Sequence, residues 1–167
     1  CTGTGACQLT NVTSPRSVSA TFAHDPVDAS CGSAANGAVA FKPSANLCAT
    51  GTPGVVLSAS GQYTWQCNSE HGGAAQQCSA PWQSAGGNGN LGAVEVDSAN
   101  GWEIRSAAFA AALPAPLPPH ARAVHAPLGL VLGQAAGSGD AQVTVRFTQP
   151  VPPGAVYYKY GPSPEGL

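Results

Sequence analysis

The sequence predicts an all-β fold, in which a small disulfide-stapled β module is followed by an incomplete antiparallel β-sandwich-like domain. The 167 residues include 21 Gly and 15 Pro, a density that favours short strands joined by turns over long helices. Six cysteines form an even set in a chain of which only 8% of the residues are charged. Several segments also alternate apolar and polar side chains with the period of a β-strand.

The cysteine content and the charge indicate a compartment and exclude some partners. An even set of cysteines in a charge-poor chain predicts disulfide bonds and an oxidising, extracellular or cell-surface location, and this composition is typical of exported bacterial proteins. Zinc is the rival interpretation, but no two cysteines have the close spacing of a zinc knuckle. The net charge of −2 without a basic cluster argues against nucleic acid. No apolar run approaches the roughly 20 residues of a membrane span, so we expect no membrane insertion within this chain.

The first segment, 1–24, contains a short glycine-rich loop between Cys1 and Cys7 and an alternating stretch at 17–22. The loop permits a Cys1–Cys7 bridge, and the alternation predicts a half-buried strand. The stretch reads C-x-G-x-G-x-C-x-L-x-x-V-x-x-x-R-S-V-x-A-T-F, which resembles the last two strands of the divergent internalin-type B-repeat of bacterial surface proteins. This resemblance implies that 1–24 are the C-terminal strands of such a domain.

The second segment, 31–82, holds Cys31, Cys48, Cys67 and Cys78, and only a few apolar residues lie between them. A segment that can bury so little apolar surface is expected to need cross-links to fold. Short strands are predicted at 39–41, 55–57 and 62–67. A hairpin symmetric about the Gly-Gly turn at 72–73 places Cys67 opposite Cys78, which would leave Cys31 with Cys48; all three connectivities of the four cysteines remain open. Trp65 is expected to pack against the sulfur atoms as the centre of the core.

The same segment carries the pattern C-G-S-A-x-N-G … P-x-x-N-L-C-x-x-G-T-P … W-x-C … G-G-x-x-x-x-C-S-A. This pattern resembles a small cysteine-rich repeat of proteobacterial secreted and surface-anchored proteins. The resemblance implies export and a modular chain, and it implies no activity.

The last part is expected to begin after a flexible linker at 83–92, because this stretch is rich in Gly, Ser and Asn. A short strand is predicted at 94–96 and a short alanine-rich helix at 104–113. Alternation then predicts strands at 128–132, 143–148 and 156–160, which suggests an antiparallel sheet or sandwich over 93–167. The acidic turn at 97–101 has one carboxylate, too few for calcium.

Two stretches of this last part are N-G-W-E-I-R-S-A-x-F, from Asn100, and V-T-V-x-F-x-Q-P-V-P-P-G-A-x-Y-Y-K-Y-G-P-S-P, from Val143. They resemble the N-terminal portion of the bacterial "choice-of-anchor U" domain. In that family the domain precedes a sorting tail, so the resemblance implies anchoring at the cell surface after export. We therefore expect this chain to be part of a longer protein, whose other domains are its partners.

No arrangement of residues predicts catalysis, a metal or a cofactor. The four histidines (His24, His71, His120 and His125) fall in predicted loops, and the eight acids are scattered, so neither a paired-carboxylate site nor a zinc site is expected. The sequence favours a non-catalytic spacer and anchor-proximal region of an exported bacterial surface protein. The alternative is an adhesin-type module for surface glycan or host protein with Trp82, Tyr157 and Lys159 as contacts. A fragment of a secreted hydrolase is the third interpretation.

Overall fold

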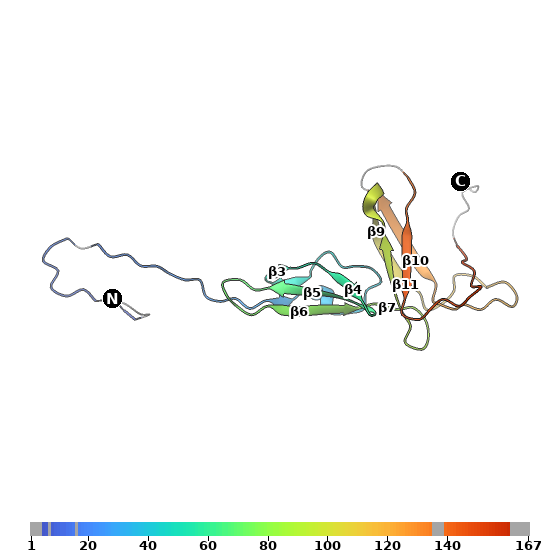
Figure 1. The fold of residues 1–167 in the computed structure, drawn as a ribbon, viewed down its shortest axis with the longest axis horizontal. Coiled ribbons are helices and arrows are strands. Elements are labelled where there is room, and N and C mark those ends of the chain that lie inside the picture. Colours follow the sequence, from blue (N-terminus) through green and yellow to red (C-terminus); the bar gives the residue numbers. More distant parts are fainter. Residues whose placement is uncertain (1–4, 7, 16, 135–138, 161–167) are drawn as a thin grey trace.

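The computed structural model describes residues 5–6, 8–15, 17–134 and 139–160. Figure 1 shows an extended N-terminal segment, a flat β module and a second group of strands that stands across the end of the module. Within the described residues the only helical elements are two short 3-10 turns, so the all-β prediction is confirmed. The elements are β1 (Ser30–Cys31), η1 (Ser33–Ala35), β2 (Cys48–Thr50), β3 (Thr52–Pro53), β4 (Leu57–Ala59), β5 (Gln62–Asn68), β6 (Gln76–Pro81), β7 (Gln83–Ser84), β8 (Leu91–Val96), η2 (Ser98–Asn100), β9 (Trp102–Phe109), β10 (Leu128–Gln134) and β11 (Val143–Phe147).

The module is built around β5, which the sequence predicted as a strand. Antiparallel β6 pairs along one edge of β5, while the short strands β3 and β4 share its other edge. Tyr63, Trp65 and Cys67 are buried, and the residues between them face outward or are half-buried. This alternation leaves one face of the sheet apolar, so a second layer has to cover it.

The second layer of the module is the antiparallel ribbon of β1 and β2. Cysteines of the ribbon pack with Tyr63, Trp65 and Trp82 in a single apolar cluster. Gly32 directly follows β1 and lies against the backbone of Asn46. A Cβ atom at this position would collide with the carbonyl group of Asn46. The close approach of these two backbones requires glycine at this position.

The second group of strands forms two small antiparallel sheets. In one, β8 lies between β7 and β11; in the other, β9 pairs with β10. Val94 of β8 and Phe109 of β9 are buried in one cluster, against which Leu128 and Phe147 also pack. The sandwich-like character of this part is therefore confirmed, although β10 and β11 belong to different sheets.

The predicted helix at 104–113 is wrong, because this stretch contains most of β9. The register of β9 with β10 shifts between Val131 and Leu132, which leaves Arg105 as an extra residue in β9. This bulge puts Ile104 and Ala107, three residues apart, on the same inward side. Apolar residues three positions apart are also typical of one face of a helix, and an alanine-rich composition favours a helix as well.

The stretch predicted as a flexible linker at 83–92 is folded. It contains β7 and the start of β8, which pair with each other, and Ala85 and Asn90 between them are buried. Gly and Asn supply the turn in which Asn88 and Gly89 have positive φ. The residue types that indicated a linker are those that a tight connection between two strands also needs.

Two predicted strands are absent, and a third, at 39–41, is reduced to single bridges from Val39 to Trp82 and from Phe41 to Val94. The stretch 17–22 forms no strand, and Val18 and Phe22 are 65% and 89% exposed. The stretch 156–160 is likewise without strand pairing, and Tyr157 is 87% exposed. In both cases the alternation is present in the sequence, but among the described residues no neighbouring strand supplies hydrogen bonds or an apolar surface to cover.

Candidate functional site

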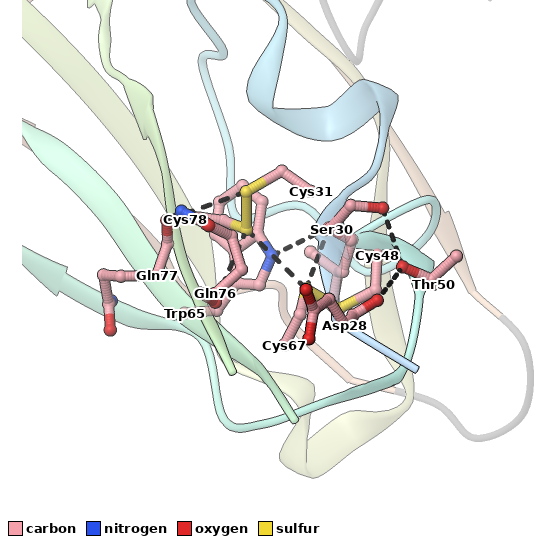
Figure 2. The surroundings of a disulfide bond; sticks show 11 residues. Asp28, Ser30, Cys31, Cys48, Thr50, Trp65, Cys67, Gln76, Gln77 and Cys78 are labelled. Carbon is pink, nitrogen blue, oxygen red and sulfur yellow. Dashed lines mark hydrogen bonds between the residues drawn. A yellow bond between two sulfur atoms is a disulfide. The ribbon is translucent and has the colours of Figure 1, made fainter. Parts of the chain in front are cut away.

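The two disulfide bonds described by the structure join the ribbon of the module to its sheet. Cys31 of β1 is bonded to Cys78 of β6, and Cys48 of β2 is bonded to Cys67 of β5. Figure 2 shows both bridges with Trp65 beside them. The predicted disulfides are thus present, but the pairing favoured by hairpin symmetry, Cys67 with Cys78, is wrong. The predicted Cys1–Cys7 bridge lies outside the described residues.

The reason for the different pairing is the register of the hairpin between β5 and β6. Its turn is centred on His71 and Gly72, which both have positive φ, and the N–H of Gly73 donates to the carbonyl of Glu70 at 3.1 Å. This is the pattern of a two-residue hairpin turn. It puts Trp65, rather than Cys67, opposite Cys78.

Trp65 occupies the centre of the module core, as the sequence predicted. It is 1% exposed, and its indole N–H donates to the carbonyl of Leu47 at 2.8 Å. Because Leu47 directly precedes β2, this bond ties the ribbon to the sheet beside the Cys48–Cys67 bridge. The indole therefore supplies both apolar contact and a satisfied polar group.

The junction between the module and the second group of strands is interlocked. Ala40, from the loop between β1 and β2, is buried in the second cluster with Val94 and Phe109. Conversely Ala93 of β8 is buried in the module cluster with Tyr63 and Trp82. Each core thus contains a residue from the other unit, which a pair of units joined by a free linker would not show.

Backbone hydrogen bonds reinforce this junction. The N–H of Val39 donates to Pro81 and the N–H of Gln83 donates to Val39, at 2.9 and 3.1 Å. The N–H of Val94 donates to the carbonyl of Ala40 at 2.7 Å. The loop between β1 and β2 is therefore held by both β6–β7 and β8.

Asn90, a buried polar side chain, connects three segments of the second group of strands. Its Oδ1 accepts from the Thr148 hydroxyl and the Gln149 N–H, at 3.2 and 3.1 Å. Its Nδ2 lies 2.6 Å from Nδ1 of His125. Since Oδ1 already serves as the acceptor, Nδ2 donates to His125, and the neutral imidazole carries its proton on Nε2. Asn90 thereby joins the turn before β8, the proline-rich loop between β9 and β10, and the residues that follow β11.

His125 lies in a loop, as the sequence predicts, but its ring is not freely exposed. Its ring stacks on Phe147 with centroids 3.8 Å apart and is partly buried. The sequence signal for such a contact is weak, because Asn90 and His125 are 35 residues apart.

Tyr63 contributes an unusual polar group to the junction. Its side chain is fully buried, and its hydroxyl has no hydrogen-bonding partner among the described residues. Burial, with a smaller contribution from the negative charge of Glu95, raises the pKa of Tyr63 to about 12. The group is therefore an inert part of the core at neutral pH rather than a proton donor or acceptor.

The residues predicted as a binding surface do not come together. Trp82 is only 6% exposed and packs on Tyr63, so it is not an available contact. Tyr157 and Lys159 are exposed, in a stretch without strand pairing. Of the ring contacts in the described part of the chain, none involves Tyr157.

The remaining titratable residues form no site with evident chemistry. His24 and His71 stack with centroids 4.1 Å apart, and both are exposed, while His120 is exposed in the proline-rich loop. Within 5–6, 8–15, 17–134 and 139–160, no three His, Cys, Asp or Glu side chains are grouped so as to hold a metal ion. A shallow hollow of about 270 Å³ lies on the module, and its lining contains no acid, base or thiol. The residues that line it include Val55, Leu57, Thr64, Gln66 and Gln77.

Over the described residues, the structure contains no helix of the length and apolarity needed to cross a membrane. Comparison of the chain with protein-family models, with curated proteins and with solved structures finds no match.

Proposed function

We propose that this chain is a non-catalytic structural spacer, an anchor-proximal region of an exported bacterial cell-surface protein. Its partners are the other domains of that longer protein. The observation that carries the proposal is the reciprocal exchange of Ala40 and Ala93 between the two cores. A junction of this kind resists bending, and a spacer needs such resistance to hold a neighbouring domain at a defined distance.

Two further observations support the proposal. The disulfides tie the ribbon to the sheet at two places, which suits a protein exposed to an oxidising and proteolytic environment. The surface is poor in charge, with only 8% of residues being Asp, Glu, Lys or Arg. Such a surface gives little electrostatic attraction to charged partners.

Surface display tests this proposal. The whole chain is placed between an epitope tag and a membrane anchor on bacterial cells, and a Gly/Ser chain of equal length is the control. A spacer is expected to keep the tag accessible to a large antibody, whereas the flexible control lets the tag approach the surface. Equal accessibility of the tag in both fusion proteins would contradict a spacer role.

A binding screen of the purified chain distinguishes the alternative. The spacer proposal predicts no saturable binding to arrays of glycans or extracellular matrix proteins. Saturable binding that is lost in Tyr157→Ala and retained in Val131→Ala would instead identify an adhesin-type module, since both side chains are exposed but belong to different segments of the chain.

A further inference from the structure

Four sulfur atoms from four strands meet in the module. The Sγ atoms of Cys67 and Cys78 belong to different bridges but lie only 3.6 Å apart. The other two cysteines, Cys31 and Cys48, are partners in the register of β1 with β2. Directly opposed residues of an antiparallel pair have Cα atoms about 4.5–5.5 Å apart, within the range that a disulfide spans. The pairing of Cys31 with Cys48 is therefore within reach of the native backbone. Cys67 and Cys78 are offset by two residues in the register of β5 with β6, but their sulfur atoms are already adjacent.

The four cysteine residues differ in their exposure to solvent. Cys67 is fully buried and Cys78 is 3% exposed, whereas Cys31 and Cys48 are partly exposed. A small thiol can thus approach the ribbon-side sulfur of either bridge. Attack on that sulfur releases the buried one as the leaving group, directly beside the other disulfide.

We propose that the module is a thiol-triggered disulfide isomer switch. The thiolate of a small monothiol attacks Sγ of Cys31, forms a mixed disulfide there and releases the Cys78 thiolate. The Cys78 thiolate attacks Sγ of Cys67, forms the Cys67–Cys78 bond and releases the Cys48 thiolate. The Cys48 thiolate attacks Sγ of Cys31 in the mixed disulfide, forms the Cys31–Cys48 bond and releases the monothiol. Two disulfides are present at the beginning and at the end, so no net oxidant or reductant is needed and the monothiol is a catalyst.

The two pairings differ in what they hold together. The native bridges join the ribbon to the sheet, whereas the isomer has one bridge inside the ribbon and one inside the sheet. The loop that carries Val39 and Ala40 into the junction lies between Cys31 and Cys48. Exchange consequently removes both covalent links between this loop and the sheet. The consequence for stiffness rests on the proposed spacer function, but the exchange itself does not.

Peptide mapping of the full chain tests the exchange. The background is Cys1→Ser/Cys7→Ser, which removes the two other cysteines. The folded protein is incubated without denaturant in catalytic amounts of reduced glutathione, quenched in acid, alkylated and digested without reduction. We expect peptides linked through Cys31–Cys48 and Cys67–Cys78 to appear while the number of free thiols stays near zero.

The third pairing, Cys31 with Cys67 and Cys48 with Cys78, is an internal control. The proposed route should form the expected isomer at least roughly tenfold faster than this third pairing, because its attacking and attacked sulfurs are already adjacent. Equal amounts of the two isomers, loss of the native bridges to free thiols only, or no reaction at all would each overturn the proposal.

A variant tests the central step without added thiol. Cys48→Ser leaves Cys67 as a free thiol 3.6 Å from Sγ of Cys78 in the native geometry. At mildly alkaline pH this variant is expected to convert in part from the Cys31–Cys78 bridge to Cys67–Cys78, with Cys31 released. A Cys31–Cys78 bridge that persists alone in the folded variant would contradict direct transfer. If the proposed spacer function fails but this transfer occurs, the switch stands without its mechanical role.

Discussion

Tyr63 carries a hydroxyl group into the core, where no described residue bonds to it. An unpaired hydroxyl loses its hydration on burial without compensation. The aromatic ring packs on Trp82, with ring centroids 6.1 Å apart, and this contact does not depend on the hydroxyl. The residue is therefore retained in the core by its ring.

Tyr63→Phe is predicted to leave the free energy of unfolding at neutral pH unchanged or to raise it by up to about 1 kcal/mol. The pH dependence separates this variant from the wild type. The pKa of Tyr63 is raised from 10.0 to about 12 in the folded state, so the wild type keeps its full stability below pH 10 and loses stability as pH rises from 10 toward 12. Chemical denaturation across this range should show a smaller loss for Tyr63→Phe.

Tyr157→Phe is the matched control, because Tyr157 is 87% exposed. It should follow the wild type at every pH. A loss of more than about 1 kcal/mol in Tyr63→Phe at neutral pH would mean that the hydroxyl is hydrogen-bonded in the native protein.

Asn90 is the opposite case, a buried polar side chain whose groups are all used. Asn90→Ala removes the bonds to Thr148, Gln149 and His125, and the backbone N–H of Gln149 loses its acceptor. We predict a loss of about 2–3 kcal/mol in the free energy of unfolding, measured by denaturant titration.

The control for Asn90→Ala is Asn36→Ala, at an exposed turn after η1. Its effect should stay within about 0.5 kcal/mol. Equal effects of the two substitutions would refute the role assigned to Asn90.

At the scale of strands, what the sequence could predict depended on whether a pattern was local. Strand β5 was predictable because Tyr63, Trp65 and Cys67 alternate without interruption. Strand β9 was not, because a bulge at Arg105 disturbs the alternation and is caused by pairing with β10. A local pattern also carries no information on whether a partner strand is present, which is why the stretches 17–22 and 156–160 alternate in sequence without forming strands.

The same distinction applies to the candidate site. The disulfides and the core position of Trp65 followed from residue types and spacing. The pairing of the cysteines did not, since a change of two residues in the hairpin register moved Cys78 from Cys67 to Trp65. Asn90 lies in a stretch whose composition predicts a linker. Its partners Thr148 and Gln149 lie more than 50 residues away in the chain, so no local pattern indicates its buried position.

The two disulfide bonds are predicted to contribute unequally to the free energy of unfolding. They close separations of 47 residues for Cys31–Cys78 and 19 residues for Cys48–Cys67. Loop-closure entropy then gives about 4 kcal/mol for the first and about 3 kcal/mol for the second. Cys31→Ala/Cys78→Ala should therefore destabilise the protein more than Cys48→Ala/Cys67→Ala in thermal unfolding. The reverse order would show that native packing around the sulfurs, rather than chain entropy, determines their contribution.

At the scale of the whole molecule, the module and the second group of strands are not two independent units joined by a flexible linker. The segment between them contains the strand β7. The backbone N–H of Phe109 also donates to Oε1 of Gln83 in β7, at 2.8 Å, which adds a hydrogen bond at this junction. Figure 1 shows the second unit standing across the end of the module. The interlocked cores make this angle a property of the fold.

The distance between the two units tests this claim most directly. Spin labels carried by unnatural amino acids replace Ser79 on β6 and Val131 on β10, two exposed positions in different units, so that the native cysteines are undisturbed. Pulsed electron resonance is predicted to give one narrow distance distribution that does not change on warming below the melting transition. A broad or multiple distribution would show that the units move independently, and it would contradict the rigid junction on which the proposed spacer function depends.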